Sequence, residues 1–505
     1  MALGSLTQTP WTVPHPLHNV QSHRAAPSLT HLLLIYLALF GIIVRLPYGY
    51  RYDYVSDRLI AHNRGQYPDG LRGPLIVHDP KSPYDGKCEK EYILTLSDWY
   101  HQQTPDILKF FQSPANFPPI TPIPDSPIMN DGESTTYEIK HGKQYLFRIL
   151  NMGAFPSFFL NFQDHEMTIV GIDGVRTQPT TATTLYVGAA QRYEVIITGK
   201  KNATSNAAIL AMFDTSMFEA PYNGSTTVLG ELEYKKKYGP PPPYQGLPNS
   251  IMPPIDDLTI KPYDNEPLLG PVTKRIPLDF NFAIINGIPR AIINNSTYLP
   301  QIVPTLYTAL SVPQEFKLDP RVYGVNSNSY PVQYGDIVEI VINNLTPFGH
   351  PFHLHGHQFQ VVARSQPNAV TNGQPYNPSQ ADPLPMKRDV AGVHPGGFVV
   401  FRFKAENPGV QLIHCHIEWH VEAGLTATIL EATDHLGDLH IPDDHKAACI
   451  AGGMPFTGNA AGNTQNPLDL TGANTQVQQT NTGALWTGNP GKSRMRKVRG
   501  RGSLL

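Results

Sequence analysis

The sequence has little cysteine, little net charge and no long hydrophobic segment. Its three cysteines in 505 residues, Cys88, Cys415 and Cys449, are too few for a disulfide scaffold, although they allow one bridge. The formal net charge of −3 gives no reason to expect nucleic acid or an anionic membrane as a partner. The apolar run Leu32–Val44 has only 13 residues, which suits a signal-peptide core or a buried strand better than a membrane span.

Helical stretches rich in Glu, Lys and Ala are also missing, and the chain has no short-period repeat. Glycine and proline instead make up 90 residues, about 18% of the chain against about 12% in average proteins. Alternating apolar and polar residues, as in Glu91–Leu96 and Ile337–Ile342, predict short strands with one buried face. Two strand-rich blocks flank a proline-rich stretch that begins after Lys235 and cannot pair as sheet. The sequence therefore predicts an all-β protein of two or three sandwich domains.

Two short segments, residues 350–357 and 414–420, hold seven histidines and one cysteine. Four of these histidines alternate along the chain: His353, His355, His414 and His416. Successive side chains of a strand point to opposite faces, so these four imidazoles would converge on one polar pocket and Cys415 would point away from it.

Cys415 can form a separate set with two histidines from the flanking turns, His350 and His420. Two imidazoles and one thiolate are the ligands of a blue copper electron-transfer site. Because Cys415 is covalently joined to His414 and His416, an electron taken up at this set could pass through the backbone to the pocket behind it. The alternatives are a purely structural role and a zinc site, but zinc prefers four N or S ligands without this two-sided layout.

With these motifs the chain resembles the multicopper oxidases, particularly their fungal laccase and ferroxidase branches, from about His62 to about Phe456. The resemblance implies tandem cupredoxin-like Greek-key β-sandwich domains, dioxygen as electron acceptor, and four coppers per complete enzyme, one type 1, one type 2 and two type 3. The implied ligands are His350, Cys415 and His420 for type 1, His353 for type 2, and His62, His355, His414 and His416 for type 3 copper. Leu425 would take the axial position without ligating, and Glu418 would relay protons as the catalytic residue.

The resemblance is incomplete in the first cupredoxin domain. His62 falls on the second histidine of the family's second His-x-His element, but Ile60 occupies its first position. Nothing upstream resembles the family's earlier His-Trp-His element, and Cys449 resembles a late cysteine whose first-domain partner is absent. These departures favour a truncated or misjoined gene model. We expect the following division: 1–61 unmatched, 62–87 remnant of the first cupredoxin domain, 88–235 second domain, 236–270 proline-rich linker, 271–435 third domain with copper ligands, 436–505 C-terminal tail.

The substrate is predicted from two positions near the type 1 histidines. Ferroxidases that resemble this chain carry acidic residues where it has Thr121 and Thr346. Because a neutral hydroxyl attracts a divalent cation only weakly, we expect a laccase-like enzyme for phenolic or aromatic substrates, such as pigment or secondary-metabolite precursors. Its substrate would bind in an apolar hollow beside His420 or His350. The alternatives are an iron-transport ferroxidase and, because trinuclear ligands are missing, a non-catalytic blue-copper protein.

We further expect a monomer that is secreted or lies at the cell surface, with dioxygen and a small aromatic molecule as its partners. Five Asn-x-Ser/Thr sequons favour this secretory route and begin at Asn202, Asn223, Asn294, Asn295 and Asn344.

Overall fold

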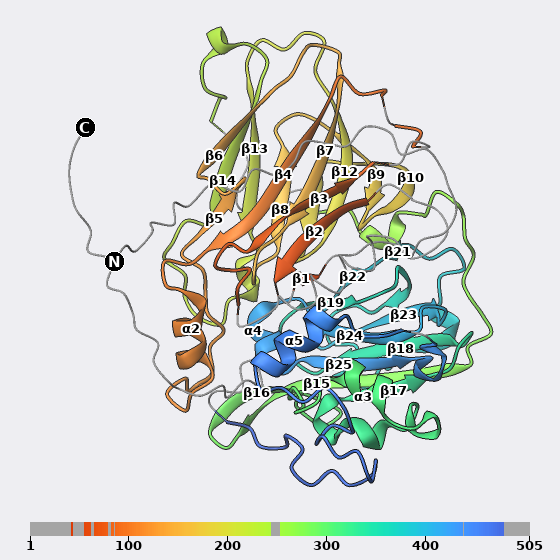
Figure 1. The fold of residues 1–505 in the computed structure, drawn as a ribbon. Coiled ribbons are helices and arrows are strands. Elements are labelled where there is room, and N and C mark those ends of the chain that lie inside the picture. Colours follow the sequence, from red (N-terminus) through yellow and green to blue (C-terminus); the bar gives the residue numbers. More distant parts are fainter. Residues whose placement is uncertain are drawn as a thin grey trace, which may run out of the picture.

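The computed structural model describes residues 42–43, 55–61, 65–78, 82–84, 86–243, 253–437 and 439–478. Two β-sandwiches lie one above the other, and their strands run in nearly perpendicular directions in Figure 1. The prediction of an all-β protein is confirmed. His62, and the apolar run Leu32–Val44 apart from Ile42–Ile43, lie outside the described residues.

The first sandwich consists of a six-stranded and a five-stranded sheet. The six-stranded sheet contains, in spatial order, β10 (Val175–Ala182), β9 (Met167–Ile172), β12 (Arg192–Thr198), β7 (Gln144–Asn151), β4 (Lys90–Trp99) and β5 (Ser126–Met129). The five-stranded sheet contains β11 (Thr184–Val187), β8 (Phe158–Phe162), β13 (Ala207–Phe213), β14 (Thr227–Glu233) and β6 (Ser134–Glu138).

The second sandwich repeats this plan. Its six-stranded sheet contains β16 (Ile288–Ile293), β15 (Lys274–Ile285), β18 (Ile337–Asn344), β23 (Phe398–Lys404), β20 (Phe359–Arg364) and β21 (Lys387–Arg388). Its five-stranded sheet contains β17 (Ser329–Val332), β25 (Thr426–Glu431), β24 (Gly409–Cys415), β19 (His350–Leu354) and β22 (Val390–Val393).

A fifth, smaller sheet, four α-helices and several short 3-10 helices complete the described fold. The small sheet pairs β1 (Ile42–Ile43), β2 (Val55–Ala61) and β3 (Arg72–Val77). The helices are α2 (Thr104–Phe111), α3 (Thr305–Ser311), α4 (Glu418–Glu422) and α5 (Asp443–Ala451). Among the described residues, no helix is both long and apolar enough to cross a membrane.

The hydrophobic core follows from the alternation seen in the sequence. In β15, the buried residues Ile276, Leu278 and Phe280 alternate with exposed ones, as expected for a strand with one face in the core. The largest apolar cluster contains residues of both sandwiches and includes Trp419, which is fully buried at their junction. Burial of this shared surface therefore stabilises the contact between the two sandwiches.

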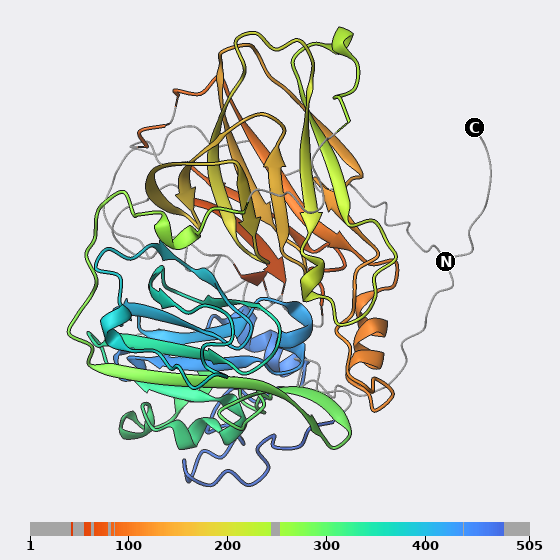
Figure 2. The same cartoon turned by 180° about the vertical axis from the view of Figure 1, so that it is seen from behind.

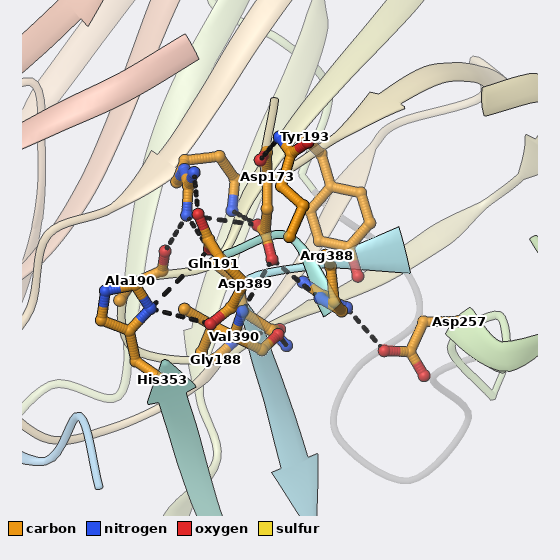
Figure 3. A network of polar contacts seen from close by, with 12 residues as sticks. Asp173, Gly188, Ala190, Gln191, Tyr193, Asp257, His353, Arg388, Asp389 and Val390 are labelled. Atoms are coloured by element: carbon orange, nitrogen blue, oxygen red, sulfur yellow. Dashed lines mark hydrogen bonds and ion pairs between the residues drawn. The ribbon is translucent and has the colours of Figure 1, made fainter. Parts of the chain in front are cut away.

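The segment that joins the sandwiches contributes charge to their junction. In Figure 2 its described part, drawn in green from residue 253, runs along the side of the molecule towards β15. Within it, Asp257 forms ion pairs with two arginines of the second sandwich, at 2.5 Å from Arg364 Nη2 and 2.6 Å from Arg388 Nη1. Figure 3 shows the second of these pairs. Burial raises the pKa of the Asp257 carboxyl, but these two guanidinium groups outweigh that effect and lower the pKa to about 2.

Asp257→Asn should therefore destabilise the fold in a pH-dependent way. The folded-state pKa lies below the unfolded value of 3.8, so the charged form stabilises the fold at neutral pH and this contribution is lost as pH falls towards 2. We expect a loss of about 2 kcal/mol in the free energy of unfolding at pH 7, measured by urea denaturation, and a smaller loss at pH 3. The matched control is Asp256→Asn, because the Asp256 side chain is 60% exposed although it also contacts Arg364. An equal loss for Asp257→Asn at both pH values would contradict this account.

Candidate metal centre

The candidate centre is built on the pairing of β19 with β24. The two strands are antiparallel, with Phe352 opposite Cys415 and His353 opposite His414. Since side chains alternate across a sheet, this register sends the paired histidines to one side and Cys415 to the other. Two groups of donor atoms, each within 4.8 Å of one another, result: His350, Cys415 and His420; and His353, His355 and His414.

The first group is a compact set of two imidazoles and one thiol. Cys415 Sγ lies 3.7 Å from His350 Nδ1 and 3.6 Å from His420 Nδ1, and the two Nδ1 atoms are 3.1 Å apart. β24 ends at Cys415, and the short helix α4 then turns the chain so that His420 returns beside the thiol. The donors are those of a blue copper site, so their chemistry fits copper.

Two threonine hydroxyls orient the imidazoles of this His2Cys set. Thr346 donates its hydroxyl proton to Asn344 Oδ1 at 2.8 Å, which leaves its oxygen as acceptor for His350 Nε2, also at 2.8 Å. Thr121 likewise donates to Glu219 Oε1 at 3.2 Å and faces His420 Nε2 at 3.4 Å. Both contacts favour the tautomer with the proton on Nε2, so each Nδ1 lone pair is directed towards Cys415.

Burial keeps all three ligands neutral when no metal is bound. It lowers the pKa of His350 to about 3 and that of His420 well below its usual value, where the neighbouring His350 adds to the effect. It also raises the pKa of the Cys415 thiol far above its usual range. Metal binding at this set would therefore release the thiol proton.

Four imidazoles share the pocket on the other side of the ladder. Ring centroids lie 4.9 Å apart for His353 and His355, 5.2 Å for His355 and His414, and 5.4 Å for His414 and His416. Backbone carbonyls orient two of the rings, because His414 Nδ1 donates to Cys415 O at 2.8 Å and His353 Nδ1 to Asp389 O at 2.7 Å. Nε2 is therefore the atom through which each of these rings would bind a metal, and His414 Nε2 lies 3.1 Å from His355 Nε2.

The other candidate residues lie around these two groups. Leu425 is fully buried, and its carbonyl accepts from Cys415 N at 3.1 Å. Glu418 is buried and its carboxyl accepts from the amide of Gly65, while burial raises its pKa to about 8. The last histidine of the first motif, His357, belongs to neither group and pairs with Glu431 Oε2 at 2.6 Å.

An open groove of about 590 Å³ adjoins the His2Cys set on the side of Thr121. Its lining is largely apolar and includes Phe110, Phe117 and Ile120, which are 57%, 75% and 37% exposed. The sequence predicted an apolar hollow beside His420, and this groove reaches that histidine through the Thr121 hydroxyl.

Glu219 is a candidate functional residue that the sequence did not reveal. Its carboxylate accepts two bonds from Thr121, from the amide at 2.6 Å and from the hydroxyl at 3.2 Å. Partial burial of the carboxyl raises the Glu219 pKa, against the opposite effect of these bonds. Glu219 lies 98 residues after Thr121 in an irregular segment, so no local pattern could have connected the two.

Comparison with known proteins identifies the family. Multicopper oxidase family models match residues 90–235 and 298–435. The iron transport multicopper oxidases FET3 of Gibberella zeae and fetC of Epichloe festucae are each 42% identical to this chain, over 82% of its length and 67% of theirs. The crystal structure of Fet3p, described as a multicopper oxidase that functions in iron import, superposes with a TM-score of 0.79 at 36% identity and covers 84% of this chain and 82% of that one.

The chain therefore belongs to the multicopper oxidase family, copper-dependent oxidoreductases that use dioxygen. It spans about two thirds of the length of these curated relatives.

The prediction of a laccase-like function for phenolic substrates is wrong. The relatives at 42% identity are named for iron transport, whereas the laccase of Botrytis aclada is only 24% identical, with a TM-score of 0.64, and shows the shared fold alone. The prediction rested on the side chains of Thr121 and Thr346 alone. The structure places the carboxylate of Glu219 directly behind Thr121.

The His2Cys set leads to a spectroscopic prediction. Cys415→Ser should abolish the intense blue absorption of the copper-loaded chain, because that absorption arises from charge transfer between thiolate and copper. Cys449→Ser is the matched control, since Cys449 is also buried but lies on α5 beside Tyr307. Visible absorption spectra of the three proteins decide the matter: a blue Cys415→Ser protein would rule out this cysteine as the ligand.

Proposed function

We propose that this chain oxidises ferrous iron to ferric iron and delivers the electrons to dioxygen. The names of the relatives at 42% identity and of the Fet3p structure support iron as the substrate. One observation in this chain carries the proposal: a carboxylate, that of Glu219, is held one hydroxyl away from His420 of the His2Cys set.

Glu219 has the properties of a cation-binding residue. The residue as a whole is exposed, while each oxygen of its carboxylate accepts one bond from Thr121. Carboxylate oxygens are the hard ligands that divalent cations prefer. A negative charge also attracts the ferric product more strongly than the ferrous substrate, which makes the loss of one electron from iron more favourable.

For the described residues, the copper assignment remains that of the sequence, with His350, Cys415 and His420 as the type 1 set and His353, His355, His414 and His416 as ligands of the trinuclear site. Copper bound at these residues would supply one-electron redox chemistry and the reduction of dioxygen. The protein fixes the histidine tautomers and joins the two sites through the backbone of residues 414–416. The buried Glu418 can hold a proton near neutral pH, in line with the relay role that the family resemblance implies.

A location outside the cytoplasm is part of this proposal. The sequons at Asn202, Asn223, Asn294 and Asn295 lie at exposed positions, but the Asn294 side-chain amide is engaged, donating to Pro277 O at 2.9 Å and to the Tyr330 hydroxyl at 2.8 Å. Asn344 is fully buried and donates to two backbone carbonyls, Phe348 O at 2.6 Å and His394 O at 2.9 Å. Protein secreted by a fungal host should therefore carry N-glycans on Asn202, Asn223 and Asn295 and none on Asn344, as mapped by mass spectrometry of its peptides. Unmodified exposed sequons would count against the secretory route.

Glu219→Gln should weaken the use of ferrous iron selectively. Loss of the charge should raise KM for ferrous iron about tenfold, equivalent to about 1.4 kcal/mol of binding free energy. KM for an uncharged aromatic amine should change less than twofold, because a neutral donor is not attracted by the charge of a carboxylate. Steady-state oxygen consumption with each donor measures both effects.

Glu231→Gln is the matched control for this experiment. Glu231 lies in the same sandwich, on β14, and its carboxylate also accepts a bond from a neutral group, Asn206 Nδ2 at 2.7 Å. Burial also raises its pKa, as it does for Glu219. Equal changes with both donors in Glu219→Gln, or the same rise of KM in Glu231→Gln, would contradict the proposed role of Glu219.

A further inference from the structure

We propose that the buried ion pair between Arg192 and Asp389 is a positioning device for His353, built into the junction of the two sandwiches. It connects β12 of the first sandwich to residue 389 of the second, immediately before β22. The proposal rests on the proposed copper-binding role of His353, but it does not depend on which substrate donates the electrons.

The link to the metal site is a backbone carbonyl. His353 Nδ1 donates to Asp389 O at 2.7 Å, and His353 and Asp389 are both buried (Figure 3). This bond sets the tautomer of His353 and the plane of its ring, so the direction of Nε2 depends on where the carbonyl of residue 389 lies. Ligand atoms must be held within about 0.5 Å of their positions for a metal site to keep its geometry.

Residue 389 and both of its neighbours are bonded to the first sandwich. Arg192 forms a bidentate ion pair with Asp389, from Nη1 to Oδ1 at 2.6 Å and from Nη2 to Oδ2 at 2.9 Å. On one side, Arg388 Nε lies 2.8 Å from Asp173 Oδ2. On the other side, the carbonyl of Val390 accepts from Gln191 Nε2 at 3.2 Å.

The guanidinium group of Arg192 is fixed in turn by its own sandwich. Arg192 Nη1 donates to Ala190 O at 3.2 Å, and the backbone amide of Arg192 donates to Asp173 Oδ1 at 2.8 Å. The Arg192 side chain is fully buried, as is Asp389 apart from 1% of its surface. The contact geometry of the two sandwiches is thereby transmitted through the side chain of Asp389 to its carbonyl and then to His353.

A buried ion pair could serve stability alone, so the test needs a comparison within the chain. Arg148 provides it, because its side chain is also 0% exposed and pairs with two carboxylates, Glu91 and Glu194. It lies on β7 in the same sheet as Arg192, but its partners belong to the first sandwich alone. Lysine in place of either arginine keeps the charge and loses the planar fork that binds a carboxylate with two bonds.

The experiment measures copper in the histidine pocket of the full chain. Cys415→Ser serves as parent, so that the copper signal of the thiolate site does not overlap the spectrum. Arg192→Lys and Arg148→Lys are each added to it, and copper titration and electron paramagnetic resonance are recorded. We expect Arg192→Lys to lower copper affinity of the pocket about 10- to 100-fold and to change the copper hyperfine coupling. Arg148→Lys should leave copper affinity and hyperfine coupling unchanged, even if it lowers the unfolding midpoint as much as Arg192→Lys does.

Gln191→Met is a milder variant for the case that Arg192→Lys does not fold. It removes two neutral bonds of the Gln191 side chain, to Val390 O and from the amide of Gly188, and should shift copper affinity and hyperfine coupling in the same direction by a smaller amount. The proposal is overturned if the parent spectrum and affinity persist in Arg192→Lys, or in Gln191→Met where that is the folded variant, or if Arg148→Lys changes them equally. A parent that binds no copper in the pocket would instead overturn the copper assignment of His353 itself, and this proposal with it.

Discussion

The antiparallel register of β19 and β24 is the constraint on which the whole candidate centre depends. With His353 opposite His414, the alternation of side chains separates a four-imidazole pocket from a His2Cys set on either side of one two-stranded ladder. A shift of one residue would exchange the faces and remove both groups of ligands at once. The rest of the second sandwich, with its continuous apolar core, holds these two strands in that register.

The register brings the ligands together, and hydrogen bonds to the imidazole rings then fix how each ring is oriented. Hydroxyl oxygens lie at the Nε2 atoms of the two imidazoles in the His2Cys set, and backbone carbonyls lie at the Nδ1 atoms of His353 and His414. Three of these four partners belong to the second sandwich, but Thr121 belongs to the first. Because residue 389 is also bonded to Arg192, the contact between the sandwiches takes part in orienting ligands on both sides of the ladder.

The sequence predicted what depends on local periodicity. Alternation along the strands gave the all-β fold, and the spacing of the two histidine motifs gave the faces on which their side chains lie. What it could not predict depends on contacts across long stretches of chain. Glu219 and Thr121 are 98 residues apart, and Arg192 and Asp389 are 197 apart. The substrate prediction considered Thr121 by its own hydroxyl, and the carboxylate of Glu219 that lies against it comes from a distant part of the chain. His357 fits the motif but pairs with Glu431, a partner 74 residues away.

The central claim is that one strand pair builds two copper sites on opposite faces. Anomalous diffraction at the copper absorption edge from crystals of the copper-loaded chain tests it most directly. The account predicts one anomalous peak among His350 Nδ1, Cys415 Sγ and His420 Nδ1. It predicts at least one further peak on the opposite face of the β19–β24 ladder, beside His353, His355 and His414. Copper bound on one face only, or at other side chains, would contradict it.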